Sequence, residues 1–360
     1  MIWALLTFAV LVFITCFHLR GGNLGRYDAP PGQSFDTGHE PSDEHDAVVA
    51  SLDVGIGPVR RAPRRQRLAL MREYMDSVSA TQDFHAAITP ANAGGVAAEW
   101  VIAPGAEPSR RVLYIHGGAF VMGSPVSHRN ITSRFSQVAR AAVLAIDYRL
   151  MPEHPRMAGI LDCRTAYTWM LENGPEGAQA AARVYVGGDS AGGNLTLSLI
   201  AWVRDQPLRQ PDAAVALSPA TDTTLGSPSL EHNLESDAML GPMFRGLTWI
   251  PRPLLWWFSW IQNRISPRNP LVSPVFGDLS RLPPTLVHAS ESELLFDDAR
   301  RYVNRAAAAG SPARLQSWAH VVHVWHMFYP QLTEARDAWD EIGRFISATD
   351  ADPANSGEQE

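Results

Sequence analysis

The sequence contains no lysine, and all 30 of its basic residues are arginine. We attribute this bias to a GC-rich coding sequence, and it carries no information about mechanism. Against 37 acidic residues, the arginines leave a formal net charge of −7. Proteins that bind nucleic acid present a dominant basic face, so this charge balance argues against nucleic acid as a partner.

Cysteine is also scarce. The chain has only Cys16, in an apolar N-terminal run, and Cys163, in a segment whose pattern predicts a helix. Two cysteines placed in this way cannot form a disulfide framework or a cysteine-based zinc site. Charged residues make up only 19% of the 360 residues and hydrophobic residues 46%, which is typical of a globular protein with one or two domains.

Charge is absent from the start of the chain. Residues 2–18 are almost wholly apolar, and as a helix they would be roughly 25 Å long, slightly short of the ~30 Å hydrocarbon core of a bilayer. A cleavable signal peptide would need a basic start and a small-residue cleavage site, and neither is present. We therefore predict an uncleaved transmembrane anchor over residues 1–19, with a processed signal and export as the alternative. Arg20 and Arg26 follow the run and favour a cytoplasmic position for the rest of the chain.

Three further segments, two near the N-terminus and one at the C-terminus, are polar or charged. Residues 21–47 are rich in glycine and proline, which is typical of a linker. A basic stretch over residues 59–68 precedes an amphipathic helical pattern, and it favours either a solvated face or contact with anionic lipid. Residues 348–360 at the C-terminus are predicted to be a disordered tail.

From residue 97 onward, short β-rich segments alternate with longer helical ones. The β-rich segments are residues 98–103, 111–116, 142–148, 183–188, 213–218, 284–289 and 313–318. The helical segments between them are residues 127–141, 159–174, 191–205 and 297–310. This alternation predicts an α/β fold, with a mostly parallel central sheet covered by helices on both faces.

Residues 222–270 interrupt the alternation and contain no clear strand. Four tryptophans fall within twelve residues of this segment: Trp249, Trp256, Trp257 and Trp260. Arginines and prolines among them argue against a second transmembrane helix. We expect a helical cap inserted over an apolar pocket, with contact between the aromatic side chains and a membrane surface as the alternative.

The stretch YVGGDSAGGN holds a G-x-S-x-G pattern centred on Ser190, directly after an apolar strand and before a helical run. This context is the one that a nucleophile elbow requires. The turn is so sharp that the residues two positions before and after the serine, Gly188 and Gly192, must be nearly free of side chain. The alternative is a glycine-rich turn in which the serine only caps the next helix.

A second motif, YIHGGAF, lies at the end of a predicted strand. Its residues Gly117, Gly118 and Ala119 can present backbone N–H groups to a developing oxyanion. Ala119 stands where a third glycine is usual; it keeps the N–H donor but adopts fewer backbone conformations. A plain turn at the end of the strand is the alternative.

Taken together, the motifs HGGAF, DYRLMPEHP, GDSAGG and RNPLVSPVFGDLSRLPPTLV resemble the hormone-sensitive-lipase family of α/β-hydrolases over residues 95–347. The resemblance implies an esterase with a Ser-His-acid triad on an α/β-hydrolase fold. It also implies that a helical cap, formed by residues 20–90 and 222–270, covers a core of residues 91–221 and 271–347. The apolar N-terminus is similar to that of the arylacetamide deacetylase-like members.

In this family the acid of the triad follows a late strand, and the matching stretch here is SELLFDD. The resemblance places Glu293 at the acid position, where an aspartate is usual. A glutamate is chemically acceptable, because the carboxylate needs only to accept a hydrogen bond from imidazole Nδ1–H and stabilise the imidazolium. Asp297 is the strongest alternative, followed by Asp298 and Glu291.

The histidine of the triad must come from HVVHVWHMF, which holds His320, His323 and His326. His323 best fits the family pattern of a histidine, an aliphatic residue and an aromatic residue; His326 is the alternative. Three histidines near Glu293 could also bind zinc. On a helix, however, the i, i+3, i+6 spacing spreads the rings over different faces, so we expect no metal.

These residues predict a serine carboxylesterase that needs no cofactor. Ser190 would attack the ester, and the N–H groups of Gly118, Ala119 and Ala191, in a hole that includes Gly117, would hold the oxyanion. The tryptophan-rich segment favours neutral, apolar esters as substrates. Removal of an acetyl group or an amide bond on a specialised metabolite is one alternative. A non-catalytic ligand-binding protein is another, because plant gibberellin receptors resemble the same family and lack the catalytic histidine.

Overall fold

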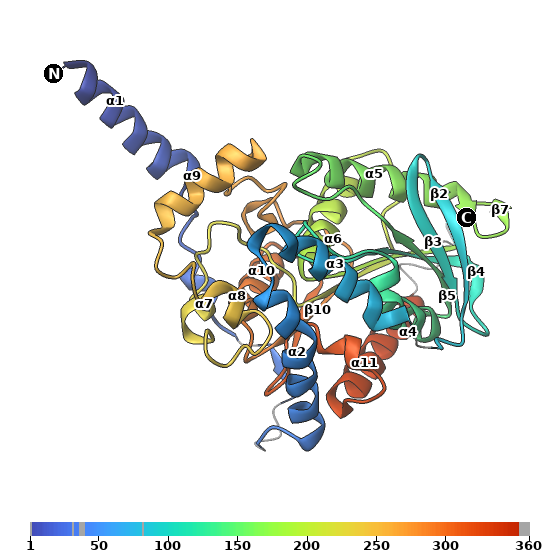
Figure 1. Ribbon diagram of the computed structural model, residues 1–360. Coiled ribbons are helices and arrows are strands. Elements are labelled where there is room, and N and C mark those ends of the chain that lie inside the picture. Colours follow the sequence, from blue (N-terminus) through green and yellow to red (C-terminus); the bar gives the residue numbers. More distant parts are fainter. Residues whose placement is uncertain (1, 31, 36–39, 81–82, 353–360) are drawn as a thin grey trace.

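The computed structural model describes residues 2–30, 32–35, 40–80 and 83–352. Nine strands form one sheet in the order β1-β11-β10-β9-β8-β4-β5-β3-β2 (Figure 1). All neighbours in it are parallel except β2–β3 and β3–β5. The strands are β1 (Gln33–Ser34), β2 (Ala87–Ala93), β3 (Val96–Ile102), β4 (Glu107–Ile115), β5 (Ala141–Ile146), β8 (Arg183–Asp189), β9 (Ala213–Leu217), β10 (Thr285–Ser290) and β11 (Ala313–Trp318). The short strands β6 (Asn173–Gly174) and β7 (Gly177–Ala178) pair separately.

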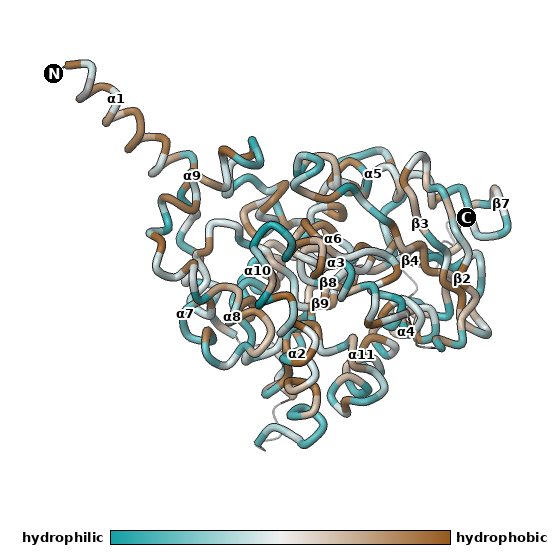
Figure 2. Tube along the Cα trace, in the orientation of Figure 1, coloured by the Kyte–Doolittle hydropathy of each residue, from teal (hydrophilic) through white to brown (hydrophobic). Residues whose placement is uncertain are grey.

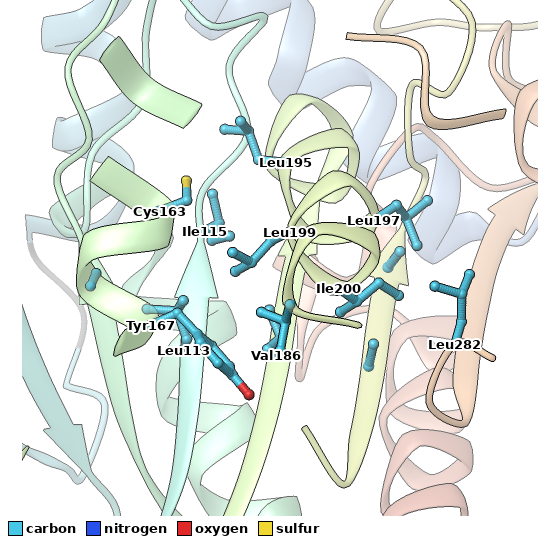
Figure 3. Packing of buried hydrophobic residues seen from close by; sticks show 14 of the residues in the cluster. Leu113, Ile115, Cys163, Tyr167, Val186, Leu195, Leu197, Leu199, Ile200 and Leu282 are labelled. Carbon is cyan, nitrogen blue, oxygen red and sulfur yellow. The ribbon is translucent and has the colours of Figure 1, made fainter. Parts of the chain in front are cut away.

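Helices cover both faces of the sheet. Alternate residues of β4 point to opposite sides, so Leu113 and Ile115 belong to one apolar cluster and Val112 and Tyr114 to another. The first cluster includes side chains of α5 (Arg156–Glu172), α6 (Ser190–Arg204) and α10 (Phe296–Ala308). Figure 3 shows part of this packing. The second includes side chains of α4 (Arg129–Ala139) and α11 (Thr333–Asp350).

The predicted α/β fold is confirmed, and each of the seven predicted strands is present within a few residues of its expected bounds. Strands β1 and β2 were not predicted. β1 is only two residues long, and its pairing with β11 is a long-range contact. The sequence of β2, AITPANA, has few of the β-branched and aromatic residues that favour strands. Antiparallel pairing with β3 along its whole length holds β2 at the sheet edge.

Two N-terminal helices lie against the chain segments that leave the sheet. Helix α2 (Asp43–Arg61) begins inside the predicted linker, where Ser42 accepts a hydrogen bond from the His45 N–H at 3.2 Å. Val48 and Leu52 of α2 pack in one cluster with Trp318 and the loop that follows β11. In α3 (Arg64–Ala80), Arg72 donates to the backbone oxygens of Val121 and Met151, at 2.8 and 3.1 Å.

Residues 222–270 contain helices and no strand, as the sequence predicts. The helices are α7 (Ser229–His232), α8 (Gly241–Phe244) and α9 (Arg252–Asn263). Helix α9 carries three of the four clustered tryptophans.

The apolar N-terminal run forms two helical pieces, α1 (Ile2–Phe13) and a π-helical segment, Ile14–Leu19. Figure 1 shows α1 leaving the body of the molecule near α9. Within the described part of the chain, no helix combines the length and the apolar character needed to cross a membrane.

The last helix reaches three residues into the segment predicted as the C-terminal tail, residues 348–360. Helix α11 continues to Asp350, and Thr349 is buried. The carboxylate of Asp350 accepts hydrogen bonds from Arg110, at 2.6 Å, and from the hydroxyl of Tyr185. These bonds extend the helix into the stretch whose composition predicted disorder. Residues 353–360, the rest of the predicted tail, lie outside the described residues.

Candidate active site

Ser190 lies at the junction between β8 and α6, as the sequence predicts. Its φ of 51° is in the left-handed region, which is costly for a residue with a side chain. The flanking glycines make this turn possible. A Cβ atom on Gly192 would lie 1.9 Å from the Ile115 carbonyl oxygen, and one on Gly188 would lie 2.6 Å from the same oxygen. The turn is therefore the strained strand–helix elbow that presents a serine side chain at the end of a strand.

The residue before the serine, Asp189, ties the elbow to the loop after β4. Its Oδ1 accepts hydrogen bonds from the Tyr114 hydroxyl at 2.6 Å and the Gly117 N–H at 3.0 Å. Its Oδ2 lies 3.4 Å from His128 Nε2. Burial raises the pKa of Asp189, but the charge of His128 and the hydrogen bonds from His128 and Tyr114 outweigh it and hold the pKa below its usual range.

The loop after β4 has three successive residues with positive φ: Gly118 at 114°, Ala119 at 54° and Phe120 at 65°. Gly118 is required for steric reasons as well, since a Cβ there would lie 2.2 Å from the Met122 carbonyl oxygen. Neither the Gly118 nor the Ala119 N–H has a hydrogen-bond acceptor among the residues that the structure describes. The chain thus has two unpaired N–H donors in succession, and the Ala191 N–H belongs to the unpaired first turn of α6.

The N–H of Gly117, which the sequence places in the oxyanion hole, already has an acceptor in the structure. This N–H makes the 3.0 Å bond to Asp189, and that bond uses the one backbone donor of the residue. Gly117 therefore anchors the loop, and the unpaired donors are those of its neighbours.

Glu293 and His323 form a hydrogen-bonded pair at the carboxyl edge of the sheet. Glu293 Oε2 lies 2.5 Å from His323 Nδ1, and Glu293 Oε1 accepts the Ser290 N–H at 2.9 Å. Both side chains are buried. Burial raises the pKa of Glu293 even though His323 opposes the shift. Burial lowers the pKa of His323, but the Glu293 charge and hydrogen bond raise it above its usual value.

The loop after β9 joins the histidine loop to the elbow. The Val324 N–H, next to His323, donates to Ser218 Oγ at 3.2 Å. Two residues further on, the Ala220 N–H donates to the Ser190 carbonyl oxygen, also at 3.2 Å. Because β8, β9, β10 and β11 are parallel neighbours, the residues that follow them meet at one edge of the sheet. The structure therefore brings the serine loop and the Glu293–His323 pair together at this edge.

Comparisons with known proteins identify the family of this chain. The family model described as the alpha/beta hydrolase fold matches residues 112–327. A crystal structure of an esterase from the bacterial hormone-sensitive lipase family superposes with a TM-score of 0.74 at 33% identity, covering 86% of this chain and 99% of that one. This chain belongs to the hormone-sensitive-lipase-like α/β-hydrolases.

Two curated relatives of this hydrolase cover most of its length. The acetyl-hydrolase of Streptomyces hygroscopicus is 37% identical over 254 residues, which are 70% of this chain and 80% of that protein. The carboxylesterase/phospholipase LipF of Mycobacterium tuberculosis is 35% identical over 279 residues, which are 74% of this chain and 71% of that protein.

In this hydrolase the three carboxylates considered as alternative triad acids are all hydrogen-bonded to groups other than His323. Asp297 accepts the Ser229 N–H at 2.8 Å and pairs with Arg300 at 2.5 Å. Asp298 accepts the N–H groups of Thr221 and Asp222, at 2.6 and 2.8 Å. Glu291 accepts the hydroxyls of Ser34 and Ser317, at 2.6 and 2.7 Å. Of the four candidate carboxylates, only Glu293 is hydrogen-bonded to His323.

The three histidines of HVVHVWHMF have three different environments. His320 is exposed, whereas His326 is buried in the short 3-10 helix Trp325–Phe328. His326 Nε2 lies 3.0 Å from Nδ1 of His288, so the two rings form a buried pair. Burial lowers the pKa of His326 well below its usual value and that of His288 to about 3. The described residues include no group of metal-ligating side chains that could hold an ion.

Two residues of the 222–270 insertion support the acid loop, and neither belongs to a motif that identifies it in the sequence. Asn233 Nδ2 donates to the carbonyl oxygens of Glu291 and Glu293, both at 2.8 Å. Asp237 Oδ2 accepts the Leu294 N–H at 2.9 Å, and its side chain is buried. Single polar residues in an irregular insertion follow no helix or strand repeat, so a sequence pattern does not identify them. The abundance of Asn, Asp and Ser around position 235 is the one signal that indicates side-chain hydrogen bonds to a neighbouring backbone.

Proposed function

We propose that this hydrolase is a serine carboxylesterase in which Ser190, His323 and Glu293 form the catalytic triad. The observation that carries the proposal is the buried 2.5 Å bond between Glu293 and His323, at the sheet edge where the elbow serine lies. That bond leaves Nε2 as the free nitrogen of the imidazole. No residue in the described part of the chain is hydrogen-bonded to it.

In the first step, Ser190 Oγ attacks the ester carbonyl carbon and His323 Nε2 takes the hydroxyl proton. Glu293 fixes the tautomer that carries its proton on Nδ1, and its negative charge stabilises the imidazolium that forms. The resulting tetrahedral intermediate collapses when His323 returns the proton to the alcohol oxygen, which leaves an acyl-enzyme. Water then attacks the acyl group while His323 takes its proton, and the carboxylic acid leaves as the Ser190 hydroxyl is restored.

The N–H groups of Gly118, Ala119 and Ala191 would stabilise the oxyanion. Gly118 and Ala119 have no internal acceptor, and their loop is fixed by the Gly117–Asp189 bond. A preorganised donor of this kind contributes on the order of 10² to 10³ in rate. The mechanism needs no metal or cofactor, because the protein supplies the nucleophile, the base and the oxyanion donors.

The proposed substrates are neutral, apolar carboxylic esters. A relative named a carboxylesterase supports the ester class, and the apolar preference rests on the predicted cap over an apolar pocket. Removal of an acetyl group is the second candidate, because a relative is named an acetyl-hydrolase. A purely binding function has less support, since it would have no use for a buried carboxylate paired with histidine.

We also propose that residues 20–90 and 222–270 form the cap over a core of residues 91–221 and 271–347. The packing of Val48 and Leu52 beside the histidine loop supports this division, as do the bonds of Arg72 to the loops after β4 and β5. Attachment to a membrane through residues 2–18, with the core on the cytoplasmic side, stays a prediction from the sequence.

Hydrolysis of p-nitrophenyl esters of graded acyl length tests the proposed function. We expect hydrolysis by the full chain, with Ser190→Ala reduced to the background rate. A Thr196→Ala variant, which removes a different buried hydroxyl from the same helix α6, should keep its rate. Activity that survives in Ser190→Ala would contradict the serine mechanism. A strong preference for acetyl esters would favour removal of an acetyl group over hydrolysis of a broad range of apolar esters.

A further inference from the structure

Helix α1 is apolar on almost every side, and its one ring contact among the described residues is the stacking of Phe13 on Phe17, just beyond its C-terminal end. Each of its side chains that the structure describes is exposed, including Trp3 at 82%, Phe8 at 67% and Phe13 at 61%. A helix that is hydrophobic all around belongs in an apolar environment. The brown colour of α1 in Figure 2 continues to its tip, away from the body of the protein.

Helix α9 presents a second exposed apolar surface. Leu254, Phe258 and Ile261 are 60%, 66% and 57% exposed, and their i, i+4, i+7 spacing places them on one face of the helix. Trp249, just before the helix, is 86% exposed. The other face is held to the protein, since Trp256 Nε1 donates to the Thr224 carbonyl oxygen at 2.7 Å. A stripe of large apolar side chains of this kind marks an interaction surface.

The two surfaces are joined just beyond the C-terminal end of α1. Trp257 Nε1 of α9 donates to Thr15 Oγ1 at 2.9 Å, and the rings of His18 and Trp260 lie 5.4 Å apart. Arg268 Nη1 donates to the Phe17 carbonyl oxygen at 2.9 Å. We call α1 together with Trp249, Leu254, Phe258 and Ile261 the α1–α9 face.

The segments that build this face carry only positively charged side chains. Residues 1–27 and 238–277 contain no aspartate or glutamate, but they contain six arginines: Arg20, Arg26, Arg245, Arg252, Arg264 and Arg268. Arg245 and Arg252 pair with glutamates of the preceding segment. Arg20 and Arg264 are exposed, and no ion pair joins either to another described residue. Exposed cations beside an apolar surface are complementary to anionic lipid headgroups.

The length of α1 fits one half of a bilayer. Twelve residues, Ile2–Phe13, make a helix about 18 Å long, and one leaflet accounts for about half of a ~30 Å hydrocarbon core. Residues 14–19 are held to the protein by the bonds from Trp257 of α9 and from Arg268, and so they are not free to lengthen the inserted part. We propose that the α1–α9 face binds an anionic bilayer from one side, with α1 inserted into one leaflet and α9 lying at the boundary between headgroups and acyl chains.

Vesicle flotation of the full chain tests the lipid partner. We expect the protein to float with phosphatidylcholine vesicles that contain phosphatidylglycerol, and less with phosphatidylcholine alone or at high salt. Replacing Leu254, Phe258 and Ile261 by serine should lower the partition coefficient by at least about ten-fold. The matched control replaces Val54 and Leu161, which are 78% and 46% exposed on α2 and α5, and should float like the parent. Circular dichroism and the unfolding temperature check that each variant is folded.

Depth measurements test the one-leaflet geometry. A Cys16→Ser, Trp3→Cys chain can carry a fluorophore at position 3, because Cys163 is buried. Nitroxides deep in the acyl chains should quench this probe more strongly than nitroxides near the headgroups. Stronger quenching by the shallow nitroxides would contradict insertion into one leaflet, since it would mean that α1 lies flat or reaches the opposite headgroups.

Three other results would overturn the proposal. One is flotation of the α9 serine variant equal to that of the parent. Another is failure of the parent to float with any vesicle. The third is a self-association in sedimentation velocity that the α9 substitutions abolish without any vesicle binding, since it would assign the face to a second copy of the chain. None of these results depends on Ser190, His323 or Glu293.

Discussion

His323 and His326 are three residues apart and both buried, yet their surroundings are chemically opposite. His323 faces a carboxylate 2.5 Å away, which raises its pKa. His326 faces another imidazole 3.0 Å away, and burial keeps its pKa well below the usual value. The partner therefore helps to decide whether the pKa of a buried histidine lies above or below its usual value. We therefore propose that His323 serves the reaction and that His326 stabilises the fold.

The largest expected effect is on His323. Replacing it by alanine removes the base, and kcat should fall by about 10⁴ to 10⁶. His320, three residues earlier and exposed, provides the matched control, and His320→Ala should keep the parental kcat. Steady-state hydrolysis of a p-nitrophenyl ester measures both variants. A His323→Ala enzyme that keeps more than a tenth of the parental rate would contradict the assignment of His323 as the base.

Glu293→Gln should have the next largest effect, with kcat reduced by about 10³ to 10⁴, because an amide cannot stabilise the imidazolium and favours the wrong tautomer. Glu291→Gln is the control, since Glu291 binds Ser34 and Ser317 instead of His323. The same assay compares the two. Equal losses in both variants would show that the acid loop, and not the Glu293 charge, supports His323.

His326→Ala should lower stability while changing kcat by less than about ten-fold. Removing the ring leaves His288 Nδ1 buried without its partner, which costs about 1–3 kcal/mol. Urea unfolding measures this loss. A large fall in kcat with unchanged unfolding would reverse the assignment of the two histidines.

The same pair predicts how stability depends on pH. His326 and His288 have lowered folded-state pKa values, that of His288 being about 3. The unfolded chain therefore binds more protons below pH ~6.5, and each ring makes stability fall by up to about 1.4 kcal/mol per pH unit as the solution is acidified. His326→Ala removes one of these rings, so its unfolding free energy should fall less steeply between pH 6 and pH 4, as urea titrations at each pH would show.

The smallest expected effect concerns Asp237. Its buried carboxylate belongs to the insertion, and its negative charge raises the pKa of His323, although less than Glu293 does. Because His323 must be neutral to accept a proton, kcat/KM should fall as the pH drops through the His323 pKa. Asp237→Asn should move this acid limb to lower pH. Movement to higher pH would contradict an electrostatic contribution from Asp237.

Much of the core and of the candidate site was predictable, because the signals are local. The sharp turn at Ser190 needs Gly188 and Gly192 beside it, and these glycines form a readable pattern. The parallel strands are buried on both faces and appear as short apolar runs. Glu293 and His323 could be named only from their positions relative to family motifs, since no local rule pairs residues thirty positions apart.

The remaining features depend on contacts that a sequence pattern does not encode. The partner of His326 is His288, on a different strand, and nothing near His326 identifies it. The sequence of the HGGAF motif does not show that the Gly117 N–H donates to Asp189, at 3.0 Å. The apolar N-terminal run predicts a membrane anchor from composition alone, but nothing in it shows that Trp257 of α9 and Arg268 bond to its last residues.

The rate at which Ser190 is labelled by a phosphonate tests the proposed triad most directly. A p-nitrophenyl phosphonate should add one phosphonyl group per chain, and mass spectrometry of the peptides should place it on Ser190. The rate should fall by at least about 10³ in His323→Ala and remain near the parental value in His326→Ala. Labelling at another residue, or equal rates in the two histidine variants, would contradict the account.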